Sequence, residues 1–173
     1  PFLALAPDGR LFHFGPTRSM NWVNPNGTGT LTSTGLTVPG TYFPKDSGWA
    51  MYDVGKIIVA GGAQSPTNGA GSNLVFHVDL NPATPVITTA QSMSRARRFA
   101  NAVILPNGEV MLIGGNTSGE KFSDNGSQLI PEIWKPQTGQ WRTVAAMVTP
   151  RNYHSCALLL PDGRVWAGGG GLG

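Results

Sequence analysis

The sequence predicts an all-β protein built from short antiparallel strands, and three observations lead to this prediction. Glycine and proline are abundant, with 24 and 14 residues, whereas charged residues make up only 12% of the chain. This composition favours short strands joined by tight turns over helices. No stretch shows a sustained helical period of apolar residues. Finally, one plan of strand, glycine turn and strand recurs four times along the chain.

Each copy of this plan has an apolar strand, a turn that ends in glycine and a second apolar strand. The turn glycines are Gly9, Gly55, Gly108 and Gly163, which are 46, 53 and 55 residues apart. In such turns proline presets φ, Asp or Asn tolerates a left-handed backbone, and glycine accepts a positive φ. The predicted hairpins lie near residues 2–15, 49–62, 99–115 and 152–171.

The spacing of the repeat indicates the architecture. A period of about 50 residues is typical of kelch-type β-propeller blades, which have four strands each. Residues 132–136 and 140–144 look like the outer two strands of one blade, so we expect Trp134 and Trp141 on neighbouring strands. The alternative is a generic β-sandwich with two unrelated core tryptophans. The regular period and the recurring paired glycines favour the propeller.

The predicted propeller is incomplete. Residues 1–173 would form a single partial propeller of about three and a half four-stranded blades, whereas propellers close with about four to eight. We therefore expect the sequence to be a fragment of a longer chain. Its open sheet faces would carry a risk of association.

Charge and composition exclude some functions. The net charge is +3, and the densest basic cluster is Arg95, Arg97 and Arg98 without interleaved aromatic residues. Nucleic-acid binding needs a concentrated patch with stacking platforms, so we expect no nucleic-acid partner. No apolar run of about 18 residues occurs, and we expect no membrane span. The chain has one cysteine, Cys156, so that no intrachain disulfide can form.

A tyrosine–histidine pair at the mouth of the last hairpin is the main candidate site. Successive residues of a regular strand face opposite sides of the sheet. Tyr153 and His154 can therefore reach one metal ion only where the strand is not yet regular, and Pro150 and Asn152 make an irregular start plausible. By itself the pair does not identify a metal site, because a tyrosine at a strand start usually packs and a single histidine usually makes hydrogen bonds.

Three further segments give the pair a context. Residues 151–155 run into an apolar hairpin that ends in four glycines, Gly168 to Gly171; residues 15–22 read GPTRSMNW and residues 131–134 read PEIW. These stretches, in register with the other hairpins, resemble the catalytic propeller of the galactose oxidase and glyoxal oxidase family of copper radical oxidases. The resemblance covers nearly the whole chain.

The resemblance implies an activity. Members of the family oxidise primary alcohols or aldehydes, including carbohydrates, with O2 and produce hydrogen peroxide. Copper and a tyrosine radical cross-linked to a cysteine share the two electrons. By position, His154 would be an equatorial copper ligand, and Tyr153 would be the axial ligand that accepts the substrate's hydroxyl proton. The cross-linked pair and the second histidine would lie outside this chain, so that the 173 residues alone are expected to be inactive. We also expect the protein to be secreted.

Three other candidate metal ligands are assigned structural roles. Cys156 should not be the cross-linking cysteine; it shares a predicted strand face with His154, and we expect it to be small, buried and apolar. His13 and His77 lie in predicted strands at positions that the family does not use for metal, and we expect them to be structural or at the surface.

The resemblance also bears on the substrate. Phe122 matches an aromatic residue that lines the substrate pocket, and we assign Phe99 to the same pocket. Galactose oxidases carry a histidine where this chain has Ala100, and their sugar-binding arginine has no clear counterpart in residues 35–46. These differences argue against galactose and favour a glyoxal-oxidase-like or broader alcohol-oxidising bacterial relative.

A second function from another class stays open. A non-catalytic kelch-like module could bind carbohydrate or protein through its blade loops, because propellers host many functions. A cysteine and a Gly-Tyr at a strand start in preceding blades would support the oxidase.

Overall fold

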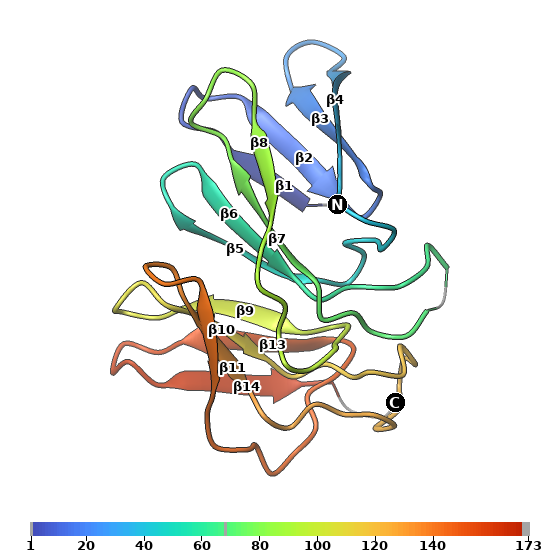
Figure 1. The fold of residues 1–173 in the computed structure, drawn as a ribbon, viewed down its shortest axis with the longest axis vertical. Helices are drawn as coiled ribbons and strands as arrows, with labels where there is room; N and C mark the ends of the chain where they lie inside the picture. Colours follow the sequence, from blue (N-terminus) through green and yellow to red (C-terminus); the bar gives the residue numbers. More distant parts are fainter. Residues whose placement is uncertain (1, 68, 171–173) are drawn as a thin grey trace.

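The computed structural model describes residues 2–67 and 69–170, and within these residues it contains strands and no helix. Three four-stranded antiparallel sheets and one two-stranded sheet follow one another along the chain (Figure 1). The strands are β1 (Phe2–Leu5), β2 (Leu11–Gly15), β3 (Ser19–Asn24) and β4 (Thr30–Thr37); β5 (Gly48–Asp53), β6 (Lys56–Ala60), β7 (Val75–Asp79) and β8 (Val86–Thr89); β9 (Asn101–Ile104), β10 (Val110–Ile113), β11 (Glu132–Lys135) and β12 (Gln140–Thr143); β13 (Ser155–Leu159) and β14 (Val165–Gly169).

Each sheet is a meander in which consecutive strands pair, as the blades of a propeller do. The first strands of the second, third and fourth sheets are neighbours in space, with β5 beside β9 and β9 beside β13. The four sheets follow one another from β1 to β14 through the molecule (Figure 1). This arrangement confirms the predicted all-β partial propeller of about three and a half blades.

Two apolar cores fill the space between the sheets. Phe12 and Phe14 of the first sheet and Phe76 of the second are fully buried in one core. The other core lies between the second and third sheets and contains Ile58 and Trp134. Burial of such side chains from two facing sheets is the main favourable contribution to folding, and it fixes the order of the blades.

The predicted turn glycines have the backbone that their role requires. Gly9, Gly55, Gly108 and Gly163 have φ values of 85°, 68°, 80° and 84°. This left-handed region is readily accessible to glycine alone, so the repeated hairpin turn could be recognised in the sequence.

The outer strands of the third sheet also lie where the sequence predicts them. Trp134 of β11 is the direct cross-strand partner of Trp141 in β12. Trp134 is 2% exposed, and its ring centroid lies 4.8 Å from those of Tyr52 and His77 on the second sheet. The tryptophan pair thus belongs to a contact between blades rather than to a generic sandwich.

The expectation that Cys156 is buried is wrong, because its thiol is exposed. Cys156 lies on the face of the β13–β14 sheet that also carries Leu158 and, opposite Leu158 on β14, Trp166. Leu158 and Trp166 are 58% and 47% exposed. The sequence predicted that Cys156 shares a strand face with His154, but His154 lies before the first residue of β13, and no other described sheet covers the face of Cys156.

The connections at one end of the sheets are joined by isolated backbone bridges. Ser72 pairs with Arg97, and Arg98 pairs with Asn116, which in turn pairs with Ser127. The bridges link the connection after β6, the connection before β9 and the connection after β10. They lie at the end of the sheets where β13 begins, and so frame the predicted site.

No helix among the described residues is long and apolar enough to cross a membrane.

Candidate metal site

Tyr153 and His154 occupy a tight turn immediately before β13. The turn runs from Asn152 to Ser155 and is closed by a 3.0 Å hydrogen bond from the Ser155 amide to the Asn152 carbonyl. His154 has a φ of 65°, the sign that a type II turn requires at its second central residue. The two rings stack with centroids 3.8 Å apart. A regular strand would send these side chains to opposite faces, whereas the turn holds them together.

Two phenylalanines from other connections pack against this pair. Phe99, just before β9, has its ring centroid 5.1 Å from that of Tyr153. Phe122, in the connection between β10 and β11, lies 5.2 Å from the Tyr153 ring and 5.6 Å from the His154 ring. All four site residues predicted from the sequence therefore meet in one cluster, although their connections belong to different blades.

The cluster is open to solvent on one side. His154 is exposed and Phe122 is 55% exposed, while Phe99 and Tyr153 are half-buried. Lys121 places its Nζ 4.9 Å from the centre of the Tyr153 ring. The result is an exposed phenol–imidazole pair with an aromatic wall and one neighbouring positive charge.

Backbone strain is concentrated here. Among the described residues, four non-glycine residues have positive φ, and three of them are Phe99, Phe122 and His154. The fourth, Asp46, accepts the Phe99 amide hydrogen on its carbonyl oxygen at 2.8 Å. A left-handed backbone costs a residue with a Cβ about 1–2 kcal/mol, and it persists only where surrounding contacts impose it. The concentration of such residues marks this cluster as a functional candidate.

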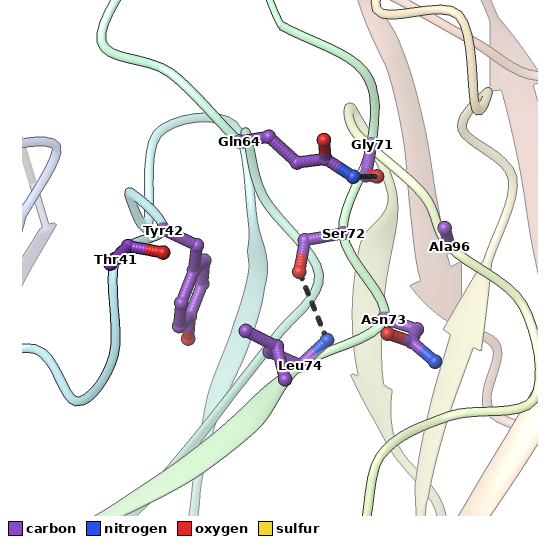
Figure 2. Close-up of a pocket in the computed structure, with 8 residues that line it drawn as sticks. All are labelled: Thr41, Tyr42, Gln64, Gly71, Ser72, Asn73, Leu74 and Ala96. Atoms are coloured by element: carbon purple, nitrogen blue, oxygen red, sulfur yellow. Dashed lines mark hydrogen bonds between the residues drawn. The ribbon is translucent and has the colours of Figure 1, made fainter.

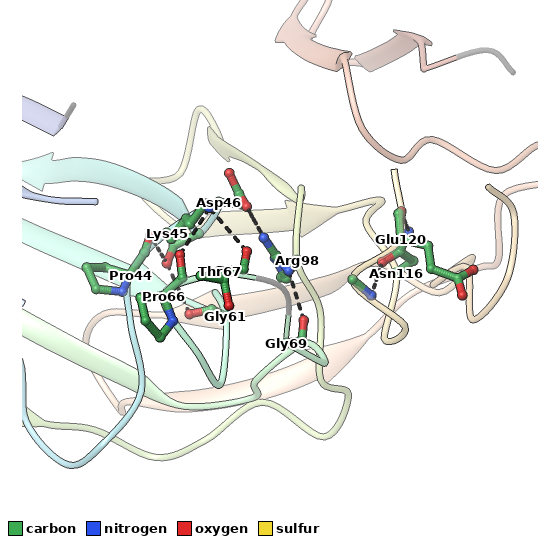
Figure 3. Close-up of polar contacts among 12 residues, drawn as sticks. Pro44, Lys45, Asp46, Gly61, Pro66, Thr67, Gly69, Arg98, Asn116 and Glu120 are labelled. Atoms are coloured by element: carbon green, nitrogen blue, oxygen red, sulfur yellow. Dashed lines mark hydrogen bonds and ion pairs between the residues drawn. The ribbon is translucent and has the colours of Figure 1, made fainter. Parts of the chain in front are cut away.

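A partly buried ion pair supports the Phe99 side of the cluster. Arg98 is fully buried and donates from Nη2 and Nε to Asp46 Oδ2 at 2.6 and 3.2 Å. Its Nη1 donates to the Gly69 carbonyl at 2.8 Å, as Figure 3 shows. Arg98 thereby fixes three connections relative to one another. The sequence showed it only as one member of a basic cluster, because its partners are 29 and 52 residues away.

Arg97 has a separate structural role. Its buried guanidinium donates to the carbonyls of Gly114 and Ile130 and lies 3.8 Å from Glu132. Burial lowers the pKa of Arg97 to about 10, and the nearby Glu132 carboxylate opposes that shift. Neither Arg97 nor Arg98 is a surface charge, so the predicted basic cluster does not form an exposed patch.

The paired glycines at the end of β10 allow the Tyr153–His154 turn to approach. A Cβ at Gly114 would collide with the carbonyl oxygen of Arg151, and a Cβ at Gly115 with that of Arg98. The Gly115 amide donates to the Arg151 carbonyl at 2.7 Å. The recurring Gly-Gly motif thus permits close backbone contact beside the site.

Asn152 is a second residue whose role the sequence did not reveal. It is 2% exposed, and its side-chain nitrogen faces three acceptors in residues 123–127. In the sequence it marked only an irregular strand start.

A separate hollow lies beside the second sheet, away from the aromatic cluster. Its volume is about 410 Å³, and Figure 2 shows Thr41, Tyr42, Gln64 and Leu74 around it. The hydroxyl of Tyr42 is buried without a hydrogen-bond partner, and burial raises the pKa of Tyr42. None of the predicted site residues lines this hollow.

The donor atoms of the aromatic cluster fit copper as part of a ligand set. Imidazole suits copper, and the tyrosine oxygen becomes a strong ligand once deprotonated. Within residues 2–67 and 69–170, no group of three or more His, Cys, Asp or Glu side chains is placed to hold a metal ion. The described residues therefore offer a tyrosine–histidine pair rather than a complete set of ligands.

Comparison with known protein families decides the relationship. The family described as glyoxal oxidase N-terminus matches residues 1–172. The chain belongs to this family. The resemblance inferred from the tyrosine–histidine motif and the repeated hairpins is thereby confirmed.

Individual relatives of this glyoxal oxidase family member carry names of oxidases. A galactose oxidase from Gibberella zeae is 33% identical over 95% of the chain, and an aldehyde oxidase from Arabidopsis thaliana is 29% identical over 98%. A fungal alcohol oxidase solved in complex with copper superimposes on 98% of the chain with a TM-score of 0.90 and 34% identity. The chain spans 25%, 31% and 36% of the lengths of these three proteins.

Proposed function

We propose that residues 1–173 form one partial kelch-type propeller domain of a copper radical oxidase, in which Tyr153 and His154 bind copper. The enzyme would oxidise a primary alcohol or aldehyde with O2. The observation that carries the proposal is the stacked Tyr153–His154 pair, held in a strained turn and walled by Phe99 and Phe122. The names of the relatives and the copper complex of the fungal alcohol oxidase support it.

With an alcohol, the overall reaction balances as one alcohol and one O2 giving one aldehyde and one hydrogen peroxide. With an aldehyde, one water is also consumed, and the product is a carboxylic acid. Bound by Tyr153 and His154, copper would supply one-electron redox chemistry, and a tyrosyl–cysteine cofactor of the complete enzyme would supply the second electron equivalent. Tyr153 would take the hydroxyl proton of the substrate on its phenolate oxygen. His154 would hold the metal through a ring nitrogen. Phe99 and Phe122 would position the carbon chain of the substrate and exclude water from one side.

The side chains of the aromatic cluster favour small alcohols and aldehydes over galactose as substrates. Residues 35–46 contain no arginine, and their one basic residue is Lys45. The Nζ of Lys45 donates to the carbonyls of Pro66 and Thr67 at 3.2 and 3.3 Å. It therefore fastens a neighbouring connection and does not point a free charge at the site. Phe99, Phe122 and the half-buried Tyr153 ring present mainly apolar surface.

The test uses the complete gene product in three forms, the wild type, Tyr153→Phe and His154→Ala. We expect one copper per wild-type molecule by atomic emission and peroxide formation with small alcohols or aldehydes. Tyr153→Phe should retain copper and lose most turnover, because it removes the proton acceptor. His154→Ala should lose most of the copper. His13→Ala is the matched control, because His13 lies in β2 and makes a 3.2 Å contact with Asn21.

Unchanged peroxide formation in Tyr153→Phe, or full copper occupancy in His154→Ala, would contradict the assigned roles. Wild-type protein that holds no copper and makes no peroxide would favour a non-catalytic module that binds carbohydrate or protein. Secretion is also part of the proposal, and comparing the protein's amounts in cells and medium tests it.

A further inference from the structure

We propose that Asn152 is a positioning residue that sets the Tyr153–His154 pair against Phe122. This inference rests on the proposed function for its significance, since it assumes that the pair binds the metal and that Phe122 walls the pocket. The geometry itself does not depend on copper. Asn152 does not touch the reacting atoms in this assignment and acts through its neighbours.

The donor group of Asn152 is directed at one short segment. Nδ2 lies 2.8 Å from Ser127 Oγ, 2.9 Å from the Ser123 carbonyl oxygen and 3.3 Å from Asp124 Oδ1. The Ser127 hydroxyl donates its own hydrogen to the Asp124 carbonyl, so it is free to accept from Asn152. Only the nitrogen end of the amide can face these acceptors, which fixes the orientation of the side chain.

The same residue also closes the turn. The Asn152 carbonyl accepts the Ser155 amide hydrogen, and Tyr153 and His154 are the two residues between them. The side chain therefore ties the 123–127 segment to the first residue of the turn that presents both rings. Phe122 directly precedes that segment. A shift of Asn152 would change the distance between Phe122 and both rings.

Other contacts do not replace this link. The bonds of Asn116 to Glu120 and of Ser118 to Asn125 lie inside the Phe122 connection and shape it without setting its distance from the turn. Backbone bonds of Arg151 with Gly115, of Met147 with Leu129 and of Val144 with Pro131 join the two connections outside residues 123–127. Between the Phe122 connection and the turn of residues 152–155, the described hydrogen bonds are those donated by the Asn152 side chain.

A structural filler would behave differently from a positioning residue. The Asn152→Asp variant keeps the size and shape of the side chain but replaces the donor by a carboxylate oxygen. That oxygen would face the Ser123 carbonyl and Asp124, which are also acceptors. The segment should therefore move away from the turn even where the protein folds.

The test is aromatic NMR spectroscopy of the complete gene product with labelled Phe, Tyr and His, before copper is added. In the wild type we expect NOE cross-peaks from Phe122 to both Tyr153 and His154. In Asn152→Asp these cross-peaks should be lost, while the Tyr153–His154 cross-peaks remain. Asn73→Asp is the matched control. Asn73 also donates a side-chain N–H to a backbone carbonyl, that of Met93 at 3.0 Å, but it lies away from the cluster. Its variant should lower the melting temperature and keep every cross-peak.

Folded Asn152→Asp with intact Phe122 cross-peaks would overturn the proposal. If that variant does not fold, Ser127→Ala removes the nearest acceptor and should weaken the same cross-peaks; unchanged intensities there would also overturn it. In the complete gene product, Asn152→Asp should lower kcat/KM on the order of tenfold or more with copper retained. Loss of the NOEs in a protein without oxidase activity would uphold the positioning role and reject the proposed function.

Discussion

Replacing His154 by glycine and, separately, by alanine measures the backbone strain in the Tyr153–His154 turn. Both variants lose the same imidazole and the same stacking contact with Tyr153, so these losses cancel between them. They differ in how well they tolerate the φ of 65° at this position. Alanine pays a left-handed cost of about 1–2 kcal/mol that glycine avoids. The glycine substitution also lowers the free energy of unfolding by about 0.5–1 kcal/mol, because glycine has more conformational freedom in the unfolded chain.

The net expectation is that His154→Gly is more stable than His154→Ala by about 0.75 kcal/mol, the difference between the midpoints of these two ranges. For a chain of this size this corresponds to about 1–4 °C in melting temperature. Urea unfolding followed by tryptophan fluorescence and thermal unfolding by circular dichroism give two independent measurements. The glycine variant should be more stable than the alanine variant, although glycine normally destabilises a folded chain relative to alanine.

A second pair of variants provides the control. Thr32 lies in the exposed strand β4 and has no positive φ. There glycine should be less stable than alanine by about 0.5–1 kcal/mol. If His154→Ala is as stable as His154→Gly, the turn does not hold a left-handed residue, and the explanation for the stacked rings is refuted.

Three further outcomes are expected. Gly163→Val should lower the free energy of unfolding by about 1–2 kcal/mol, because φ is 84° and space around the missing Cβ is open; an unchanged melting temperature would show that this turn is misread. Burial lowers the pKa of His77 from 6.5, so the unfolded state binds more protons than the folded state in the pH range between the two pKa values. The free energy of unfolding should therefore fall as pH drops from about 6.5 toward the folded pKa. His77→Gln should remove that decline, and urea titrations across this range would detect the difference. Arg98→Met should cost about 2 kcal/mol, less than for a fully buried pair because Asp46 is 25% exposed, and Arg98→Met combined with Asp46→Asn should cost less than the two changes summed.

The features that the sequence predicted well depend on local chemistry. Gly163 could be placed in a turn because a Pro-Asp-Gly stretch restricts the backbone within three residues. Trp134 and Trp141 could be paired because a short turn separates two strands of equal length. Tyr153 and His154 were recognised because they adjoin such a hairpin.

The features that it missed depend on partners distant in the chain. The acceptors of Asn152 lie 25 to 29 residues upstream, and the carboxylate of Arg98 lies 52 residues upstream. Alternation placed Cys156 in a strand, but it contains no information on whether another sheet covers the face on which Cys156 lies. Long-range packing decides these cases.

The bridged connections around the aromatic cluster have a consequence for engineering. Each of these connections forms backbone hydrogen bonds with the next one, through the bridges Ser72–Arg97 and Arg98–Asn116. No single loop is therefore an independent unit. Grafting one loop from a relative would leave its neighbour with unmatched amides and carbonyls. Loop variants of this chain should therefore be made by transplanting adjacent loops as a set, or by changing side chains on an intact main-chain framework.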